Sequence, residues 1–248
     1  MPYLKLLALL TITLVFVVFC NHGTTMPNDV SSLMTTDEAQ IPEPIATDTI
    51  EEARHLMRTV DTAYQRILFF GDSMVEGLKL RMDDYAEANG YKLTSVVWYS
   101  STTQTWAETD TLSYFIDIVQ PTYIMVCLGA NEQFVKNVES RKAYINRIIH
   151  LIGPTPYIWI GVPAWKEDTG INQLTQTMVG KGRYFDSRSL ELERSSDHIH
   201  PTFPAAAFWM DSIARWMEGI ETHHPIRMSA TAYTRRHKSK TYTLQPLR

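Results

Sequence analysis

Three polar segments contain the residue types of nucleophilic acyl chemistry, and each follows an apolar or β-rich run. Ser73 comes directly after the apolar run 67–70, at the start of a helical pattern. Asn131 follows a later apolar run, and Asp197 precedes His200 by three residues. An imidazole that is oriented by a carboxylate can accept a serine proton, and an amide N–H can stabilise the resulting oxyanion. We therefore predict a serine nucleophile, its base, the acid that orients the base, and one oxyanion donor.

Each of these residues also has an ordinary structural interpretation. A serine at a helix start is often an N-cap, and an asparagine after a strand is often a turn residue. A metal site is another alternative, because Asp197, His198 and His200 carry ligand atoms and His223 and His224 follow downstream. Neighbouring histidines on one loop rarely converge on one ion without a ligand from elsewhere, so we favour no metal.

Apolar runs alternate with amphipathic stretches through the middle of the chain, which indicates strands alternating with helices. We predict five strands, at 67–70, 93–98, 122–128, 157–162 and 183–186. We predict helices from patterns at 75–85, 106–119, 145–152 and 206–217. This order predicts an α/β fold, a flavodoxin-like three-layer α/β/α sandwich with a five-stranded parallel sheet. Functional residues of such sheets follow the carboxyl ends of the strands, where the candidates stand.

The N-terminal residues 1–20 have the pattern of an export signal. Residues 6–20 contain no charged side chain, a length that is typical of a signal-peptide core and short for a membrane-spanning helix. The segment is expected to be cleaved, to stay as a membrane anchor, or to end in a lipidated Cys20. Residues 21–50 are rich in Thr, Asp, Pro and Ser and predict a flexible linker. We therefore expect an exported protein, periplasmic or at the cell surface.

Composition limits the remaining classes of function. The chain has 248 residues, of which 44% are hydrophobic, and a net charge of −4, which fits one medium domain and disfavours nucleic-acid binding. Two cysteines cannot form a disulfide framework. We assign residues 51–221 to the catalytic domain. Residues 222–248 are rich in Lys and Arg, and we predict a solvated basic tail, with attachment to an anionic surface as the alternative.

Taken together and in this order, the three segments resemble those of the SGNH hydrolases, also called GDSL esterases. The matching blocks are Gly71-Asp72-Ser73-Met74, Gly129-Ala130-Asn131-Glu132 and Asp197-x-x-His200-Pro201. The resemblance covers about residues 66–220. It implies that Ser73 is the nucleophile, His200 the general base and Asp197 the acid that orients it. It also implies that Asn131 and the Ser73 N–H donate to the oxyanion, and that no metal or organic cofactor is required.

The sequence departs from the family pattern in three places. Met74 stands where Leu is usual, and Glu132 stands where Asp is usual. The glycine that normally follows the second strand is absent from 98–103. A backbone N–H does not require glycine, so we predict Ser100 as the remaining oxyanion donor, with Ser101 as the next candidate. Asp72 is expected to brace the nucleophile turn by accepting backbone N–H groups.

The substrate is the least constrained prediction. Trp106 and Trp165 follow strand-end loops and are candidates for stacking on a sugar, although burial in the core is the commoner fate of such tryptophans. Exported chains that resemble this family often act on O-acetyl groups of cell-wall or surface polysaccharides. We therefore predict a serine esterase for an acylated carbohydrate or another small ester. The oligomeric state is left open.

Four other functions fit parts of the pattern. An O-acetyltransferase would use the same triad and pass the acyl group to a sugar, although this chain lacks a multi-span acetyl-delivery domain. A lipase or lysophospholipase would need a deeper apolar cleft. An inactive glycan-binding module would explain the missing glycine, although the triad residues are present. A nucleotide-binding flavodoxin-like protein ranks last, because no glycine-rich phosphate loop is present.

Overall fold

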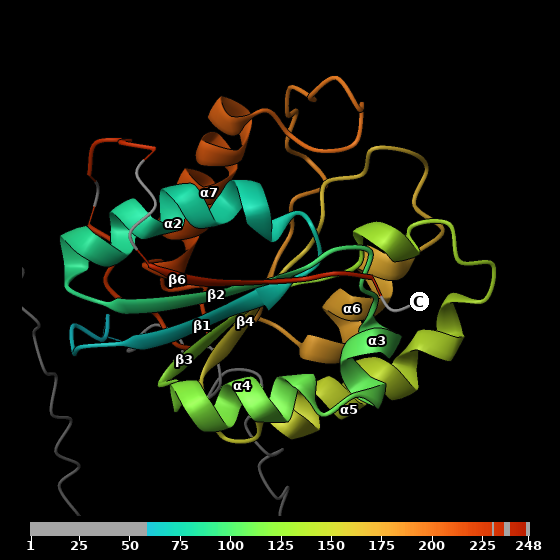
Figure 1. Ribbon diagram of the computed structural model, residues 1–248, viewed down its shortest axis with the longest axis horizontal. Coiled ribbons are helices and arrows are strands. Elements are labelled where there is room, and N and C mark those ends of the chain that lie inside the picture. Colours follow the sequence, from blue (N-terminus) through green and yellow to red (C-terminus); the bar gives the residue numbers. More distant parts are fainter. Residues whose placement is uncertain (1–58, 230, 236–238, 247–248) are drawn as a thin grey trace, which may run out of the picture. The chain divides into compact units, whose positions relative to one another are not determined.

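The computed structural model describes residues 59–229, 231–235 and 239–246 (Figure 1). The predictions for the export segment 1–20, with Cys20, and for the linker 21–50 concern residues outside these ranges. Within the described ranges, every helix is too short or too polar to cross a membrane.

Six parallel strands form a single sheet in the order β5-β4-β3-β1-β2-β6 (Figure 1). The strands are β1 (Arg66–Gly71), β2 (Lys92–Trp98), β3 (Tyr123–Cys127), β4 (Tyr157–Ile160), β5 (Tyr184–Phe185) and β6 (Lys240–Leu244). The predicted class, a parallel α/β sandwich, is therefore confirmed, but the predicted five strands are one too few. The order of the first five strands is that of flavodoxin-like sheets, and β6 adds to it beyond β2.

Helices cover both faces of the sheet (Figure 1). One face carries α2 (Val75–Asn89) and α7 (Phe203–Met217). The other face carries α3 (Thr103–Glu108), α4 (Thr111–Val119), α5 (Lys142–Ile152) and α6 (Ile171–Val179). Two short 3-10 helices, η1 (Ala130–Glu132) and η2 (Val138–Arg141), lie in the connection from β3 to α5.

Two helices differ from the prediction. The single helix expected at 106–119 is divided between α3 and α4, because Thr109 adopts an extended backbone conformation between them. The helix α6 was not predicted. It begins after Gly170 and is held at its start by Asp168, whose carboxylate accepts the N–H groups of Gly170 and Ile171 at 2.9 Å each.

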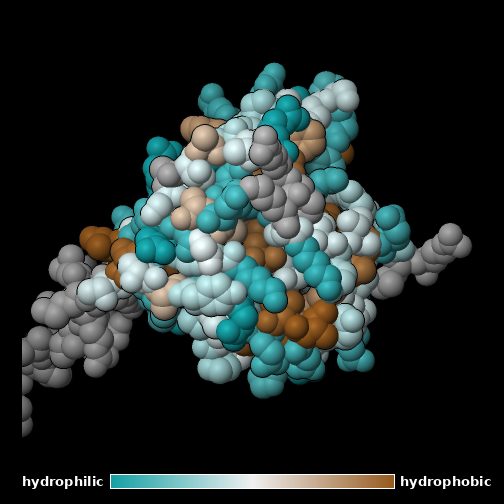
Figure 2. Space-filling view, turned by 60° about the vertical axis from the view of Figure 1, so that its left-hand side comes forward, coloured by the Kyte–Doolittle hydropathy of each residue, from teal (hydrophilic) through white to brown (hydrophobic). Residues whose placement is uncertain are grey.

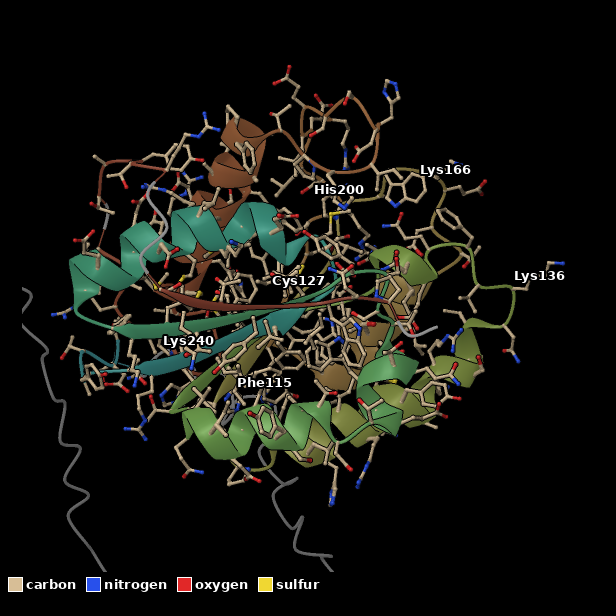
Figure 3. All side chains as sticks on the ribbon, viewed as in Figure 1. Phe115, Cys127, Lys136, Lys166, His200 and Lys240 are labelled. Atoms are coloured by element: carbon tan, nitrogen blue, oxygen red, sulfur yellow. The ribbon has the colours of Figure 1, made fainter. Side chains whose placement is uncertain are left out.

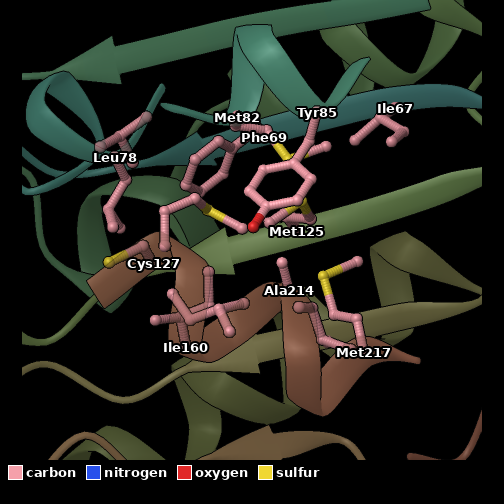
Figure 4. Close-up of a cluster of buried hydrophobic side chains, with 14 of the residues drawn as sticks. Ile67, Phe69, Leu78, Met82, Tyr85, Met125, Cys127, Ile160, Ala214 and Met217 are labelled. Carbon is pink, nitrogen blue, oxygen red and sulfur yellow. The ribbon is translucent and has the colours of Figure 1, made fainter. Parts of the chain in front are cut away.

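The apolar runs of the strands contribute alternately to two cores, one on each face of the sheet. Ile67 and Phe69 pack toward α2 and α7, whereas Leu68 and Phe70 pack toward the helices of the opposite face. Figure 4 shows the first core, in which side chains from β1, β3 and β4 meet those of α2 and α7. Strands buried on both faces explain why the sequence shows continuous apolar runs. The surface seen in Figure 2 is largely hydrophilic, with small hydrophobic patches.

The C-terminal segment was predicted as a solvated tail, and the structure corrects this prediction. Ile226 and Met228 are buried in the core beside α7. Residues 240–244 form β6, which pairs in parallel with β2. Buried acids of α2 hold the connecting segment: Asp84 accepts the N–H of Thr234 at 3.1 Å, and Asp83 accepts the N–H of Ser239 at 3.1 Å. Of the basic residues of this segment that the structure describes, Lys240 belongs to β6, and Arg227 and Arg235 belong to the connection from α7.

The direction of the strands places the catalytic candidates together. In a parallel sheet all carboxyl ends meet at one edge, and in this order β1 and β3 lie side by side although they are not consecutive. The chain leaves these two strands toward opposite faces, which opens a crevice at their ends. Ser73 follows β1 and Asn131 follows β3.

Candidate active site

Ser73 stands in the turn between β1 and α2. A Cβ atom at Gly71 would lie 1.8 Å from the backbone oxygen of Cys127, so only glycine fits there. The close approach lets the Asp72 N–H donate to the same oxygen at 3.1 Å, which joins the ends of β1 and β3. Ser73 is half-buried, and its own N–H has no hydrogen-bond acceptor within the described part of the chain. This N–H therefore points to a ligand or to solvent.

Asp72 connects the nucleophile turn to the loop after β3. Its carboxylate is fully buried and accepts the Met74 N–H at 3.0 Å through Oδ1 and the Ala130 N–H at 3.1 Å through Oδ2. Burial raises the pKa of Asp72 to about 7, although the two hydrogen bonds act in the opposite direction. These contacts agree with the expected bracing role of Asp72. They show that its carboxylate holds the loop after β3 as well as the nucleophile turn.

His200 lies between Ser73 and Asp197 and contacts both. Its Nε2 is 2.8 Å from the Ser73 Oγ, and its Nδ1 is 2.7 Å from the Asp197 Oδ2. A carboxylate can only accept, so Nδ1 carries the proton and Nε2 is left to accept the serine hydroxyl. The hydrogen bond from His200, together with the N–H groups of Ile199 and His200, holds the pKa of Asp197 well below its usual range. The geometry matches that of a serine nucleophile with an oriented base.

The loop that carries Asp197 and His200 is exposed and is closed by its own backbone. The Ser195 N–H donates to the His200 carbonyl at 2.8 Å, and the following Thr202 caps α7. Arg194 attaches this loop to its neighbour: it donates to the Ile199 carbonyl at 2.6 Å and to the Ala164 carbonyl at 3.2 Å. The Arg194 side chain therefore fixes the position of His200 relative to the loop that contains Trp165.

Ser100 and Asn131 face the nucleophile from the ends of β2 and β3. Ser100 has a φ of 59°, the left-handed conformation that glycine adopts most readily, at the place where a glycine was expected. Its N–H has no acceptor among the described residues. The Asn131 Nδ2 donates to the Ser101 carbonyl at 2.9 Å, which orients the amide and leaves its second N–H for a ligand. Both residues line one hollow with Ser73 and His200.

Glu132 joins the loop after β3 to the start of α3. Its carboxylate is fully buried and accepts the Thr103 N–H at 2.8 Å and the Thr103 hydroxyl at 2.7 Å. The Arg141 Nε lies 3.1 Å from the same carboxylate. Burial raises the pKa of Glu132, while Thr103 and Arg141 favour its charged form. This network holds the segment after β2 against the Asn131 loop, so that the two oxyanion candidates share one support.

Two hollows meet at Ser73 and His200. The first has a volume of about 240 Å³ and is lined by Ser100, Asn131 and Trp165. The second has a volume of about 260 Å³ and extends toward the starts of α2 and α7, where Phe203 forms part of its wall. A substrate with its carbonyl carbon beside the Ser73 Oγ therefore has space on both sides.

The two predicted sugar-stacking tryptophans have different positions. Trp165 lines the first hollow, where its ring packs edge-on against Phe134 at 4.9 Å. Trp106 is fully buried, so the prediction that it contacts substrate is wrong. It lies within α3 and packs on Phe70, with ring centroids 4.6 Å apart. Its indole N–H donates to the Ser101 hydroxyl at 2.9 Å, so it supports the segment that holds Asn131.

Among the described residues, no group of three or more His, Cys, Asp or Glu side chains is arranged for an ion. His223 and His224 lie elsewhere: the His224 ring is near Asp61, 3.6 Å away, and His223 contacts Arg183. Cys127 is buried at the end of β3 (Figure 3), and burial raises the pKa of its thiol well above the ordinary value.

Sequence reasoning missed three contributors to the site. Glu132 was noted only as a substitution for Asp, and its role depends on Thr103 and Arg141, which are distant in the sequence. Arg194 carried no local signal. Phe203 follows Pro201-Thr202 at the first position of α7. An apolar residue at the exposed start of a helix is the pattern that could have indicated its place in the wall of the second hollow.

No protein-family profile and no curated protein sequence matches this chain. Among solved structures, it is similar to the psychrotrophic esterase EstA from Pseudoalteromonas sp., with 17% sequence identity and a TM-score of 0.47. The match covers 62% of this chain and 98% of that chain. What this chain does is therefore inferred from its own side chains.

Proposed function

We propose that this chain is a serine ester hydrolase of the SGNH type. One observation carries the proposal: Ser73, His200 and Asp197 form a continuous relay, with heavy-atom distances of 2.8 Å and 2.7 Å, at the crevice of a parallel sheet. Among the described residues the N–H groups of Ser73 and Ser100 have no protein acceptor, and Ser100 and Asn131 line the hollow beside the nucleophile. If Ser73 served only as the N-cap of a helix, neither the histidine nor these N–H groups would be needed beside it.

The chemistry follows from the relay. His200 Nε2 takes the proton of the Ser73 hydroxyl as Oγ forms a bond to the ester carbonyl carbon. The carbonyl electron pair moves onto oxygen, where the backbone N–H groups of Ser73 and Ser100 and the side-chain amide of Asn131 would stabilise the negative charge. When the C–O bond to the alcohol breaks, the imidazolium returns its proton to the leaving oxygen. Water then repeats the sequence on the acyl-enzyme and releases the acid.

The left-handed backbone at Ser100 supports an active site over an inactive binding module. A residue other than Gly, Asn or Asp adopts a positive φ at an energetic cost, and such positions persist where the surroundings demand them. Here the residue with this conformation lines the hollow beside Ser73, and its N–H has no acceptor among the described residues. The missing glycine therefore changes the residue type and keeps the donor.

We further propose that the acyl group is short and is carried by a cell-wall or surface carbohydrate. Neither hollow is larger than about 260 Å³, which leaves no room for a long buried acyl chain. The apolar N-terminal segment favours export to the periplasm or the cell surface, where such polymers occur. Side-chain exposures of 37% for His200 and 45% for Asp197 give water free access to the acyl-enzyme, which favours hydrolysis over transfer.

The full chain and its Ser73→Ala variant should be compared on p-nitrophenyl esters of increasing acyl length. We expect acetyl ester hydrolysis that is lost in the variant and that falls steeply by butyryl. Equal rates for the two proteins would overturn the assignment of Ser73. A rate that rises with chain length would instead favour a lipase-type esterase.

A further inference from the structure

The two hollows beside Ser73 have the same kind of rim. At the outer edge of each, an aromatic ring is partly exposed and a cationic side chain lies over it. In the first hollow the ring is that of Trp165, supported by Phe134, which is 44% exposed. In the second it is Phe203, which is also 44% exposed. A rim of this kind on both sides is more than the hydrolysis of a small ester requires.

Lys166 supplies the cation beside the first hollow. Its Nζ lies 5.1 Å from the centre of the Trp165 ring and 5.7 Å from that of Phe134. Figure 3 shows Lys166 at the same end of the sheet as His200, with Lys136 farther out on another loop. Within the described ranges Lys166 has no carboxylate within salt-bridge distance. Contact with two rings restrains the side chain and leaves its charge available to a ligand.

Arg235 supplies the cation beside the second hollow. It belongs to the segment that crosses from α7 to β6, and its guanidinium carbon lies 5.0 Å from the centre of the Phe203 ring. Its backbone has a φ of 54°, an uncommon conformation for arginine. Among the described residues it too lacks a carboxylate partner. A segment distant in sequence thus brings a second unneutralised cation to the rim.

The acidic side chains at the site are already occupied by protein donors. The Glu76 carboxylate accepts the Tyr99 hydroxyl at 2.8 Å. Asp197 accepts from His200 and from two backbone N–H groups. The Glu193 carboxylate accepts the Thr202 hydroxyl at 3.2 Å. Apart from the oxyanion candidates beside Ser73, the groups that remain to recognise a ligand at the two rims are therefore the two rings and the two cations.

We infer that the ester is carried by an anionic glycan, a carboxylate-bearing sugar chain that spans both hollows. This inference rests on the proposed function and specifies the substrate of the same site. Sugar rings would pack on the faces of Trp165 and Phe203, and carboxylates of neighbouring sugars would pair with Lys166 and Arg235. A chain is favoured over a lipid because both hollows are small and have polar as well as apolar walls.

The test measures kcat/KM for acetate release by the full chain from two probes, acetylated oligogalacturonate and acetylated xylo-oligosaccharide. We expect the anionic probe to be preferred by about tenfold or more at low ionic strength, and the preference to shrink as NaCl approaches about 0.5 M. Lys166→Gln and Arg235→Gln should each lower the ratio of anionic to neutral kcat/KM about fivefold, the size of an exposed ion pair. Lys166→Arg should keep most of the preference.

Lys92→Gln is the matched control, because Lys92 is an exposed lysine at the start of β2, the opposite end of that strand from the site. It should leave the ratio unchanged. Equal kcat/KM on the two probes, or a ratio that neither variant alters, would overturn the inference. Faster hydrolysis of anionic phospholipid vesicles than of oligogalacturonate would also overturn it, in favour of a lipid. Absence of hydrolysis of p-nitrophenyl acetate by the unmodified chain would count instead against the proposed function.

Discussion

Ser73 and Asn131 lie on turns that are held by buried carboxylates, whereas His200 and Asp197 lie on an exposed loop. Asp72 and Glu132 have no solvent-exposed surface, and between them they accept the backbone N–H groups of three different segments. The Asp197 side chain is 45% exposed and contacts its own loop. The half of the site that we propose to stabilise the oxyanion is therefore held by carboxylates of the core, and the half that we propose to move protons is attached at the surface.

The difference separates stability from chemistry. A change in the buried half should alter folding and activity together, because the same carboxylates support the core and the donors. A change in the exposed loop should alter activity alone. The two halves are joined at the hydrogen bond between Ser73 and His200, at 2.8 Å.

The largest expected effect is that of Asp197→Asn in the exposed half. The amide would favour the wrong tautomer of His200, and the analogous change in a serine protease lowers kcat by about 10⁴-fold. We expect a loss of that order in kcat for p-nitrophenyl acetate and a nearly unchanged midpoint of urea unfolding. A loss of folding comparable to the loss of activity would show that this loop, too, supports the core.

The next effect is that of Glu132→Ala in the buried half. Removal of this carboxylate leaves Thr103 and Arg141 without their buried acceptor, which should lower the free energy of unfolding by about 3–5 kcal/mol. Glu132→Gln is the control, since it keeps one acceptor and should cost about 1–3 kcal/mol. Urea unfolding followed by tryptophan fluorescence measures both. Equal stability of the two variants and the unmodified chain would mean that the network does not hold the oxyanion segments.

Asn131→Ala should act on the transition state with little effect on folding, although it stands beside Glu132. Loss of one oxyanion donor typically lowers kcat by about 10²–10³-fold. KM should change little, because the donor acts mainly on the charge that develops during the reaction. An unchanged kcat would exclude Asn131 from the oxyanion site and leave only backbone donors.

The last expected effect is a pH dependence of stability that arises from Asp72, and it concerns folding alone. Its pKa is about 7 in the folded chain, above the value of about 3.9 for an exposed aspartate. The folded state therefore binds more protons between these values, and the stability from this group is full below about pH 4 and is lost as the pH rises through about 7. Asp72→Asn should flatten this part of the curve of unfolding free energy against pH. An identical slope in both proteins would show that Asp72 is ionised throughout.

Much of the fold and most of the reacting residues could be predicted, because the sequence patterns that indicate them lie within short segments of the chain. Continuous apolar runs indicate strands covered on both faces, and the position of Ser73, Asn131 and His200 after strands follows from the topology of a parallel sheet. β6 was missed because its sequence, Lys-Thr-Tyr-Thr-Leu, is polar and ambiguous, and its pairing depends on a distant partner, β2. Its Lys240 is typical of an edge strand.

The supporting residues could not be predicted for a related reason. Glu132 and Thr103 are 29 residues apart, and no pattern in either segment indicates the other. Trp106 resembled a surface aromatic because it follows a polar loop, but the fold covers that face with helices and buries it. Residues that react are recognisable by type and spacing, whereas residues that hold them are recognisable only once the elements are packed.

Covalent labelling of the full chain by a fluorophosphonate tests the central claim most directly. The reagent reacts with a serine whose hydroxyl is activated by a base, and it leaves a stable phosphonyl group on Oγ. We predict one adduct per chain, located on Ser73 by peptide mass spectrometry, absent from Ser73→Ala and much slower to form in His200→Gln. Absence of an adduct on Ser73, or an adduct on a different serine that accompanies loss of esterase activity, would contradict the account.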